Sequence, residues 1–393
     1  MTSHFQTIVV GLGAMGSATV LQLSKRKGKV LGLDSLAPPH TFGSTHGDTR
    51  ITRQAIGEGE HYSPLALRSY ELFREVEKQT GQKILEITGG LIISNATDPA
   101  SINHAEQFLA NTVSAAKKYK IAHDMLDATE IRKRFPQFNV RDDEVGYFEH
   151  EAAFLRPELT VQSQLDLAKQ NGAEIHLNEK MLQFTETANG VTVKTEKALY
   201  TADKLVLSVG PWLSQFSQNL QSLFKPFRQV LYWFDISQHH DDFALGKFPI
   251  FIWQLKGHDN GIYGFPAIDG PAGGFKVATE VYDEPTTPES CERTVSAEET
   301  QKTFEEKVRP YFPNASSRCV RSAVCIYTVT PDGGFVIDWL PSSKRILLCS
   351  PCSGHGFKHS SAIGEAVADL VRDESPKVDL NPFRLNRFEN ANV

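Results

Sequence analysis

The most constraining feature of the sequence is a glycine motif between two strand-like segments at the start of the chain. Residues 5–10 (FQTIVV) form an apolar, β-branched run, GLGAMG follows at once, and residues 29–34 (KVLGLD) form a second run. The segment between the runs carries an apolar helical stripe. Strand, glycine turn, helix and strand in this order predict the βαβ unit that binds dinucleotides.

Three glycines and one acid in this unit have separate tasks. Gly11 permits the tight turn out of the strand, Gly13 lets the backbone approach a pyrophosphate, and Gly16 lets the helix pack closely on the strand. The helix N-terminus offers unpaired N–H groups and a positive dipole end to phosphates. Asp34 ends the second strand, where its carboxylate can accept hydrogen bonds from ribose hydroxyls. The motif by itself does not distinguish FAD from NAD.

Length, charge and cysteines limit the class of protein. A chain of 393 residues is too long for one compact core, so two domains are expected. The formal net charge of -6 argues against a nucleic-acid partner, and no apolar run of about 18 residues predicts a membrane-spanning helix. An odd number of cysteines, without a recognisable export signal, predicts a reducing cytoplasm. The chain has one C-x-x-C motif and no second Cys or Cys/His pair to complete a tetrahedral site, so no zinc site is predicted. The five cysteines are Cys291, Cys319, Cys325, Cys349 and Cys352.

The order of predicted elements indicates an α/β part and an α+β part. Alternating α/β patterns occupy both ends of the chain and its middle, and antiparallel-like strand patterns dominate the stretch before residue 320. We therefore predict a discontinuous, Rossmann-like nucleotide-binding domain, interrupted by a substrate domain built on an antiparallel sheet. The first is expected to comprise residues 1–85, 150–217 and 325–393, and the second residues 86–149 and 218–324.

Three further motifs carry a resemblance to a known family. The segments PPHTFGSTHGDTRITR (38–53), SAVCIYTVTPDGGFVID (322–338) and SGHGFKHSSAIGE (353–365) resemble the monomeric sarcosine oxidase and N-methyltryptophan oxidase family. This family is a branch of the D-amino-acid-oxidase-like flavoproteins, and the similarity runs over essentially the whole chain. The resemblance implies FAD as cofactor, joined covalently to the cysteine that matches Cys325.

The resemblance also implies roles for individual residues. Arg53 and Lys358 match the pair that holds the substrate carboxylate, which suits a guanidinium fork and an ammonium. Lys276 matches the lysine that helps oxygen react with the reduced flavin, where it would stabilise developing negative charge. Arg50 would place positive charge beside the flavin ring, and Tyr327 and Tyr263 are expected to line the pocket. The residues expected to contact FAD are Gly11, Gly13, Gly16, Asp34, Ser44, His46, Thr49, Arg50, Gly210, Cys325, Gly354, Gly356, Phe357 and Lys358.

One departure from the family pattern bears on the substrate. The sarcosine-oxidising members carry a histidine at the substrate, and Glu280 stands at the matching position. A carboxylate there favours a protonated amine, which is a poor hydride donor, or it meets a second cationic group on a larger substrate. A side chain that points to solvent is a third possibility. Glu280 is therefore a candidate catalytic residue with Lys276 and Arg50.

These features together predict an FAD-dependent oxidase of a small secondary amino acid, sarcosine or another N-methyl amino acid. The imine product would hydrolyse to formaldehyde and an amino acid, and oxygen would be reduced to hydrogen peroxide. The expected partners are the amino acid and oxygen, and the chain is expected to be a monomer. N-methyltryptophan, pipecolate and glycated amino acids remain alternative substrates. An NAD-dependent dehydrogenase and a flavoprotein without turnover remain alternatives of another class.

Overall fold

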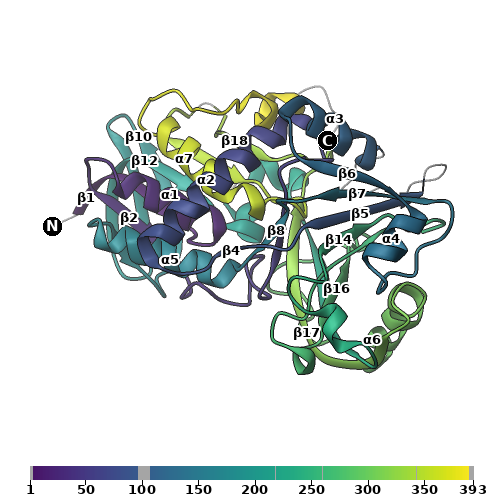
Figure 1. The fold of residues 1–393 in the computed structure, drawn as a ribbon. Helices are drawn as coiled ribbons and strands as arrows, with labels where there is room; N and C mark the ends of the chain where they lie inside the picture. The colour runs from purple at the N-terminus through teal and green to yellow at the C-terminus, as the bar shows by residue number, and fades with distance from the viewer. Residues whose placement is uncertain (1–2, 96–106, 217, 259, 342, 389–393) are drawn as a thin grey trace.

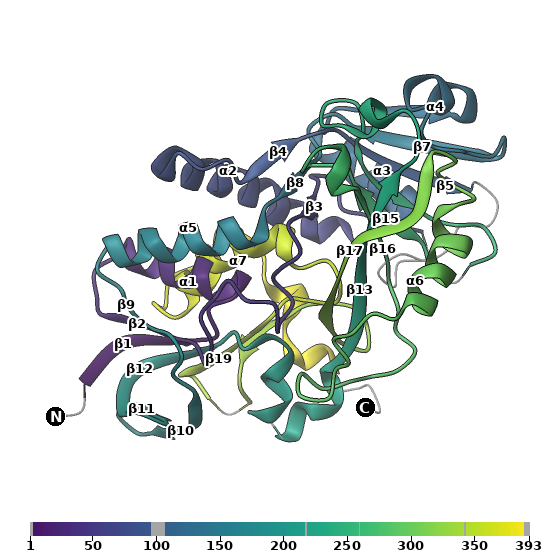
Figure 2. The same cartoon turned by 90° about the horizontal axis from the view of Figure 1, so that it is seen from below.

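The protein contains two large sheets with a small sheet between them (Figure 1). The structure is a computed structural model that describes residues 3–95, 107–216, 218–258, 260–341 and 343–388. Helices cover one face of the first large sheet, and the second large sheet extends away from that layer (Figure 2). The predicted fold class, an α/β part with an α+β part, is confirmed.

The first large sheet is mostly parallel and is centred on the N-terminal strand. Its central strands are apolar on both faces, as expected of strands that are covered on both sides. Helices α1 (Ala14–Ser24), α5 (Pro157–Gln170) and α7 (Ser360–Leu370) pack against one another on the same side of this sheet (Figure 2). Its strand order is β10-β11-β12-β1-β2-β9, with β19 also beside β12 and β18 beside β19. The strands are β1 (Ser3–Val10), β2 (Val30–Leu33), β9 (Glu174–His176), β10 (Met181–Thr187), β11 (Gly190–Thr195), β12 (Leu199–Leu207), β18 (Val336–Trp339) and β19 (Ile346–Ser350).

The second large sheet is antiparallel except at one junction, where β14 runs parallel to β5. Its order is β17-β13-β16-β15-β14-β5-β7-β6, and a phenylalanine-rich core lies against it. Helix α4 (Ala128–Arg134) packs on β6 and β7. The strands are β5 (Gly90–Asn95), β6 (His123–Asp127), β7 (Glu144–Glu149), β13 (Lys225–Ile236), β14 (Ile250–Trp253), β15 (Ile262–Phe265), β16 (Phe275–Thr279) and β17 (Ala315–Val329).

A three-stranded antiparallel sheet lies between the two large ones (Figure 2). It consists of β3 (Arg50–Thr52), β8 (Ala153–Leu155) and β4 (Leu85–Ile87), with β8 in the middle. Helix α2 (Ser63–Thr80) follows β3 and packs on α7. This small sheet places β3 between the two larger sheets, so residues at its ends can reach both.

The division into two domains at the residue numbers given above stays a prediction. The strands of the first sheet come from the three segments assigned to the nucleotide-binding part. Strand β17 starts in the other part, pairs with β13 along its length, and continues past residue 325. The two parts therefore share this strand.

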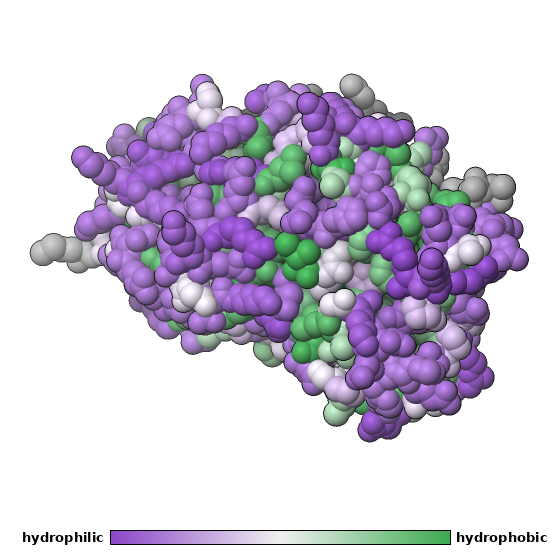
Figure 3. All heavy atoms as spheres, in the orientation of Figure 1, coloured by the Kyte–Doolittle hydropathy of each residue, from purple (hydrophilic) through white to green (hydrophobic). Residues whose placement is uncertain are grey.

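The surface is mainly polar. On the face in Figure 3 hydrophilic residues dominate, and the apolar residues form small separate groups. Within the part of the chain that the structure describes, no helix is long and apolar enough to cross a membrane.

Candidate active site

The glycine turn after β1 has the geometry that phosphate binding requires. Gly11 has φ +87°, and a Cβ there would overlap the Ser208 carbonyl. A Cβ at Gly16 would overlap the Gly11 carbonyl oxygen, so α1 packs closely on the turn. Gly13 is the N-cap of α1 and supplies no side-chain cap. The first N–H groups of α1 are therefore left for a ligand.

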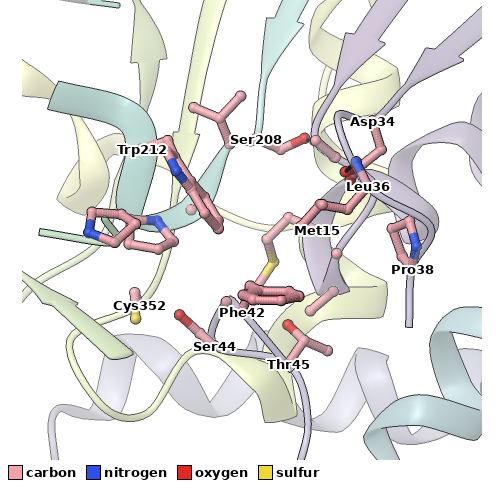
Figure 4. A pocket seen from close by; sticks show the side chains of 18 of the residues that line it. Met15, Asp34, Leu36, Pro38, Phe42, Ser44, Thr45, Ser208, Trp212 and Cys352 are labelled. Atoms are coloured by element: carbon pink, nitrogen blue, oxygen red, sulfur yellow. Dashed lines mark hydrogen bonds between the residues drawn. The ribbon is translucent and has the colours of Figure 1, made fainter. Parts of the chain in front are cut away.

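A cavity of about 510 Å³ lies over this turn (Figure 4). Its volume is in the range of cofactor sites in proteins. Its walls come from the turn after β1, the segment that follows β2, the end of β12, and the segment after β19. Nine of the expected cofactor residues line it: Gly11, Gly13, Asp34, Ser44, Arg50, Gly210, Gly354, Gly356 and Phe357. Gly16, His46, Thr49, Cys325 and Lys358 do not line it.

Asp34 is fixed at the wall of this cavity. Its two carboxylate oxygens accept hydrogen bonds from the Leu12 N–H at 2.7 Å and the Leu36 N–H at 2.9 Å. Burial raises the pKa of Asp34, while these two N–H groups oppose that shift. A carboxylate accepts about four hydrogen bonds, so capacity remains for ribose hydroxyls. The turn, the helix end and Asp34 together fit the ADP-ribose half of a dinucleotide.

The loop that precedes β3 is held by a carboxylate that the sequence interpretation missed. Glu158 Oε1 accepts hydrogen bonds from the Gly47 N–H at 2.6 Å and the Asp48 N–H at 3.2 Å. Arg50, the first residue of β3, donates to the Thr49 and Ser44 carbonyls of this loop, each at 2.9 Å. Glu158 follows the proline that begins α5, a common place for an acidic residue, and this is the only signal for it in the sequence.

Lys276 in β16 is brought to this loop. Its Nζ donates to the Gly47 carbonyl at 2.7 Å, the Thr49 carbonyl at 3.0 Å and the Thr49 hydroxyl at 3.1 Å. The side chain is 1 % exposed and lies over the rings of Trp233 and Phe265. Burial, with the neighbouring charge of Arg50, holds the pKa of Lys276 well below its usual value. The structure thus brings the amino group of Lys276, Thr49 and Arg50 together in one buried site.

His46 lies in the same loop and is buried. Burial, with the charge of Arg50 and then that of Lys276, lowers the pKa of His46 to about 3. Its imidazole is therefore neutral at physiological pH.

Strand β17 carries Cys325 and Tyr327 on one face, because they are two residues apart. The Tyr327 hydroxyl lies 2.8 Å from that of Tyr263 in β15. Cys325 is fully buried and is not among the residues that line the large cavity, whereas Cys352 is. Burial raises the pKa of the Cys325 thiol, and the charge of Arg50 opposes that shift.

A second cavity of about 60 Å³ adjoins the first. The two cavities share Arg50, Tyr327, Gly354 and Phe357 as lining residues. The small cavity is also lined by Tyr263, and by the two candidate carboxylate-binding residues, Arg53 and Lys358. Ligands in the two cavities would therefore share these wall residues.

Arg53 and Lys358 are joined by a carboxylate that sequence reasoning also missed. Arg53 Nη2 lies 2.5 Å from Glu58 Oε2, and Lys358 Nζ lies 3.3 Å from Glu58 Oε1. Arg53 also donates to the Ala55 carbonyl, and its buried Nε has no hydrogen-bond partner among the described residues. Burial lowers the pKa of Lys358 to about 8, against the attraction of Glu58. Two cations share one anion here, which leaves one positive charge for a ligand.

Glu280 follows β16 directly and lines the small cavity. It is 7 % exposed, so the possibility that it points to solvent is wrong. Burial raises the pKa of Tyr263 and of Tyr327, and the charge of Glu280 adds to both shifts. Burial lowers the pKa of Lys358, and the charge of Glu280 opposes that shift. The cavity thus contains a second carboxylate beside the cationic pair.

Among the residues described in the structure, no group of histidine, cysteine, aspartate and glutamate side chains is arranged to hold a metal ion. The described cysteines are all free thiols, the C-x-x-C pair Cys349 and Cys352 included.

Comparisons with known proteins agree with this geometry. A family model described as FAD dependent oxidoreductase matches residues 6–370. The chain is 40% identical over 372 residues to monomeric sarcosine oxidase of Streptomyces avermitilis, covering 94% of each chain. It is 37% identical over 393 residues to monomeric sarcosine oxidase of Bacillus sp. strain B-0618, covering 98% of this chain and 97% of the relative. It is 32% identical to N-methyl-L-tryptophan oxidase of Salmonella typhimurium, covering 98% of this chain and 99% of the relative.

Solved structures show the same fold at lower sequence identity. NikD, described as an unusual amino acid oxidase, has a TM-score of 0.83 at 21% identity and covers 98% of both chains. L-proline dehydrogenase from P. horikoshii has a TM-score of 0.81 at 18% identity and covers 99% of both chains.

Proposed function

The chain belongs to the FAD-dependent oxidoreductases, and within that family we propose that it oxidises a small secondary amino acid. The observation that carries this proposal is the buried set of Arg53, Glu58 and Lys358 in the wall of the small cavity. Its surplus positive charge suits the carboxylate of an amino acid. The family membership also favours FAD over NAD, which the glycine motif left open.

FAD is the group that the large cavity fits. The turn after β1 and the open N-terminus of α1 would hold its pyrophosphate, and Asp34 its ribose. When bound, FAD supplies a two-electron acceptor for the carbon next to the substrate nitrogen. The residues of the chain bind the carboxylate, orient the donor carbon and exclude water from both cavities.

The volume of the small cavity limits the substrate. A cavity of about 60 Å³ holds about four to six water-sized groups, at roughly 10–15 Å³ each. Sarcosine is of that size, and an indole side chain is not accommodated without movement of the walls. We therefore place sarcosine, or another N-methyl amino acid of similar size, ahead of N-methyltryptophan.

Arg50 and Lys276 are proposed to act on the cofactor side of the site. Arg50 lines both cavities and would place positive charge where negative charge develops on reduction. Lys276, held by the Gly47 and Thr49 carbonyls, would stabilise the charge that develops when oxygen is reduced. The hydroxyls of Tyr263 and Tyr327 lie 2.8 Å apart, and both tyrosines line the small cavity.

A covalent bond between FAD and Cys325 is proposed from the family resemblance. Burial raises the pKa of the Cys325 thiol, and the charges of Arg50 and then Lys276 oppose that shift, towards the thiolate, which is the reactive form. Cys352 is the matched control because it lines the large cavity, as Cys349 also does, whereas Cys325 does not. We expect denatured Cys325→Ser protein to release its flavin, while wild-type and Cys352→Ser protein retain theirs. Release from the wild type, or from Cys352→Ser alone, would overturn this assignment.

The reaction that follows from this site removes two electrons and two protons from the C–N bond. The imine then takes up water and gives formaldehyde and glycine from sarcosine, and oxygen takes the electrons and protons to give hydrogen peroxide. The test measures oxygen uptake, formaldehyde and peroxide with sarcosine and, separately, with N-methyltryptophan. Equal amounts of the three with sarcosine support the proposal. Turnover of N-methyltryptophan alone contradicts the substrate assignment, and turnover of neither contradicts the proposed activity.

Location and assembly are further proposals. The five free thiols suit a reducing compartment, which supports the cytoplasm. Several relatives carry monomeric in their names, which supports a monomer, and gel filtration tests this directly.

A further inference from the structure

Glu280 adds an anion to a cavity whose other charges already bind a carboxylate. Glu58 offsets one of the two cations Arg53 and Lys358, so these three side chains account for one ligand anion. Glu280 directly follows β16 of the second large sheet, next to Thr279, which pairs with Ile262 at the start of β15. The cavity therefore carries a cationic wall and a separate carboxylate.

An amino acid at neutral pH carries both of the charges that this arrangement complements. Its carboxylate suits Arg53 and Lys358, and its ammonium group suits Glu280. A second cationic group on a larger substrate would also suit Glu280, but a longer molecule would not fit the volume of about 60 Å³ without movement of the walls. The zwitterion of a small amino acid is the ligand that satisfies both the charges and the size.

We propose that Glu280 binds the cationic amine of the substrate and accepts its proton, so that the chain takes small amino acids as zwitterions. This inference rests on the proposed function and names the substrate form for the same site. The N–H bond of the ammonium group breaks, its electron pair stays on nitrogen, and the proton moves to a Glu280 carboxylate oxygen. The neutral amine can then be oxidised. Glu280 returns the proton to solvent after the product leaves.

The groups that face Glu280 allow this exchange. The charge of Glu280 acts on four titratable side chains around it. They are Tyr282 on the same segment, Tyr263 on β15, Tyr327 on β17 and Lys358 after β19. Burial raises the pKa of each of the three tyrosines, so their hydroxyls remain neutral donors. Lys358 is the one titrating cation of this set near neutral pH. Between pH 6 and 7.5 Lys358 stays mainly protonated.

The first test is anaerobic calorimetry in two buffers of different ionisation enthalpy, which counts the protons released on binding. Wild-type protein should bind sarcosine without releasing a proton. Glu280→Gln should bind sarcosine about 10- to 100-fold more weakly, because one charge-assisted contact is lost. Methoxyacetate, which has an ether oxygen in place of the amine, should bind the variant at least as tightly as the wild type. Glu284→Gln, an exposed carboxylate nearby, is the matched control.

The second test is the rate of anaerobic flavin bleaching from pH 6 to 7.5. An aliphatic amine has a pKa near 10, so its neutral fraction rises about tenfold per pH unit. In Glu280→Gln the bleaching rate should follow the neutral fraction of the amine and rise about tenfold per pH unit. In the wild type and in Glu280→Asp the bleaching rate should rise much less with pH. A merely structural role would lower the rate equally at each pH.

Three results would overturn the inference. They are release of a proton when wild-type protein binds sarcosine, equal loss of affinity for sarcosine and methoxyacetate in Glu280→Gln, and an unchanged pH profile in that variant. Binding is measured without turnover, so failure of the oxidase activity is distinguished from failure of this inference.

Discussion

In the small cavity the negative charge of Glu58 partly offsets the positive charges of Arg53 and Lys358, and buried charges need such partners. A buried charge without a partner costs several kcal/mol, and removing one partner of a buried pair typically costs about 3–5 kcal/mol. When no substrate is bound, Glu58 holds both cations in place, with its carboxylate 2.5 Å from Arg53 Nη2 and 3.3 Å from Lys358 Nζ. The resemblance pointed to both cations, but Glu58 had no motif of its own. Only the fold brings it between them.

The charge of Lys358 should control the affinity for carboxylates. Its pKa of about 8 means that it loses its proton as pH rises through that value. We expect the dissociation constant of methoxyacetate to rise above pH 8 in wild-type protein. Lys358→Met should bind at least about tenfold more weakly and lack this pH dependence, because Glu58 then offsets Arg53. Titrations from pH 6 to 9.5 check this. A wild-type affinity that is constant over the range would contradict it.

Lys276 should affect the oxygen reaction and leave substrate oxidation nearly unchanged. Removing a preorganised electrostatic group typically costs about 10²–10³ in rate. Lys276→Met should slow reoxidation of the reduced flavin by that factor, while the anaerobic bleaching rate stays close to that of the wild type. Stopped-flow absorbance separates the two half-reactions, and exposed Lys302→Met is the control. Equal loss in both half-reactions would show that Lys276 has another role.

At the scale of elements, the site depends on segments that are distant in sequence. Glu158 at the start of α5 holds the loop before β3, and β16 brings Lys276 to the carbonyls of that loop. Helices α2 and α7 are joined by Arg68 and Glu365 through two hydrogen bonds of 2.8 and 2.7 Å. This pair links the helix that follows β3 to the helix that follows Lys358.

The Arg68–Glu365 pair gives a stability prediction with a defined pH range. Hydrogen bonds with Arg68 and then Lys377 lower the pKa of Glu365 to about 2 from 4.5. Its contribution is therefore complete above pH 4.5 and is lost as pH falls towards 2. Glu365→Gln should destabilise the protein by about 1–3 kcal/mol at pH 7, and this difference should shrink below pH 4.5. Urea unfolding at several pH values tests this, with Glu75→Gln as control. A difference that is the same at pH 3 and pH 7 would contradict it.

Sequence reasoning was most successful where the chemistry is local. The turn at Gly11, the helix α1 and the position of Asp34 follow from a short continuous pattern, and the structure confirms the βαβ unit. The parallel pairing of β5 with β14 and the small sheet around β8 join segments far apart in the chain. No periodicity within a segment specifies its partner, so these contacts were not predicted. Glu158 was missed for the same reason.

At the scale of the whole molecule, the large cavity joins parts of the chain that are otherwise far apart. Its walls come from the first forty-five residues, the end of β12 and the segment after β19. The small cavity adds residues from β3, β14 and β15. A ligand that spans both cavities would therefore connect the two large sheets.

Removal of the cofactor should lower the stability of the entire molecule. Cys325→Ser protein from which flavin has been removed should melt at a lower temperature than the same variant with FAD. At a free FAD concentration of 100 times its dissociation constant, the gain is about 2.7 kcal/mol. Thermal unfolding with increasing FAD measures this. A melting temperature that does not respond to FAD would contradict the assignment of the large cavity.

The most direct test of the central claim is anaerobic mixing of purified protein with sarcosine while the flavin absorbance is recorded. We predict that the yellow absorbance bleaches, that it returns when air is admitted and the sarcosine is used up, and that hydrogen peroxide forms in the same amount as the sarcosine consumed. A yellow protein that neither sarcosine nor another small secondary amino acid bleaches, although dithionite does, would contradict the account.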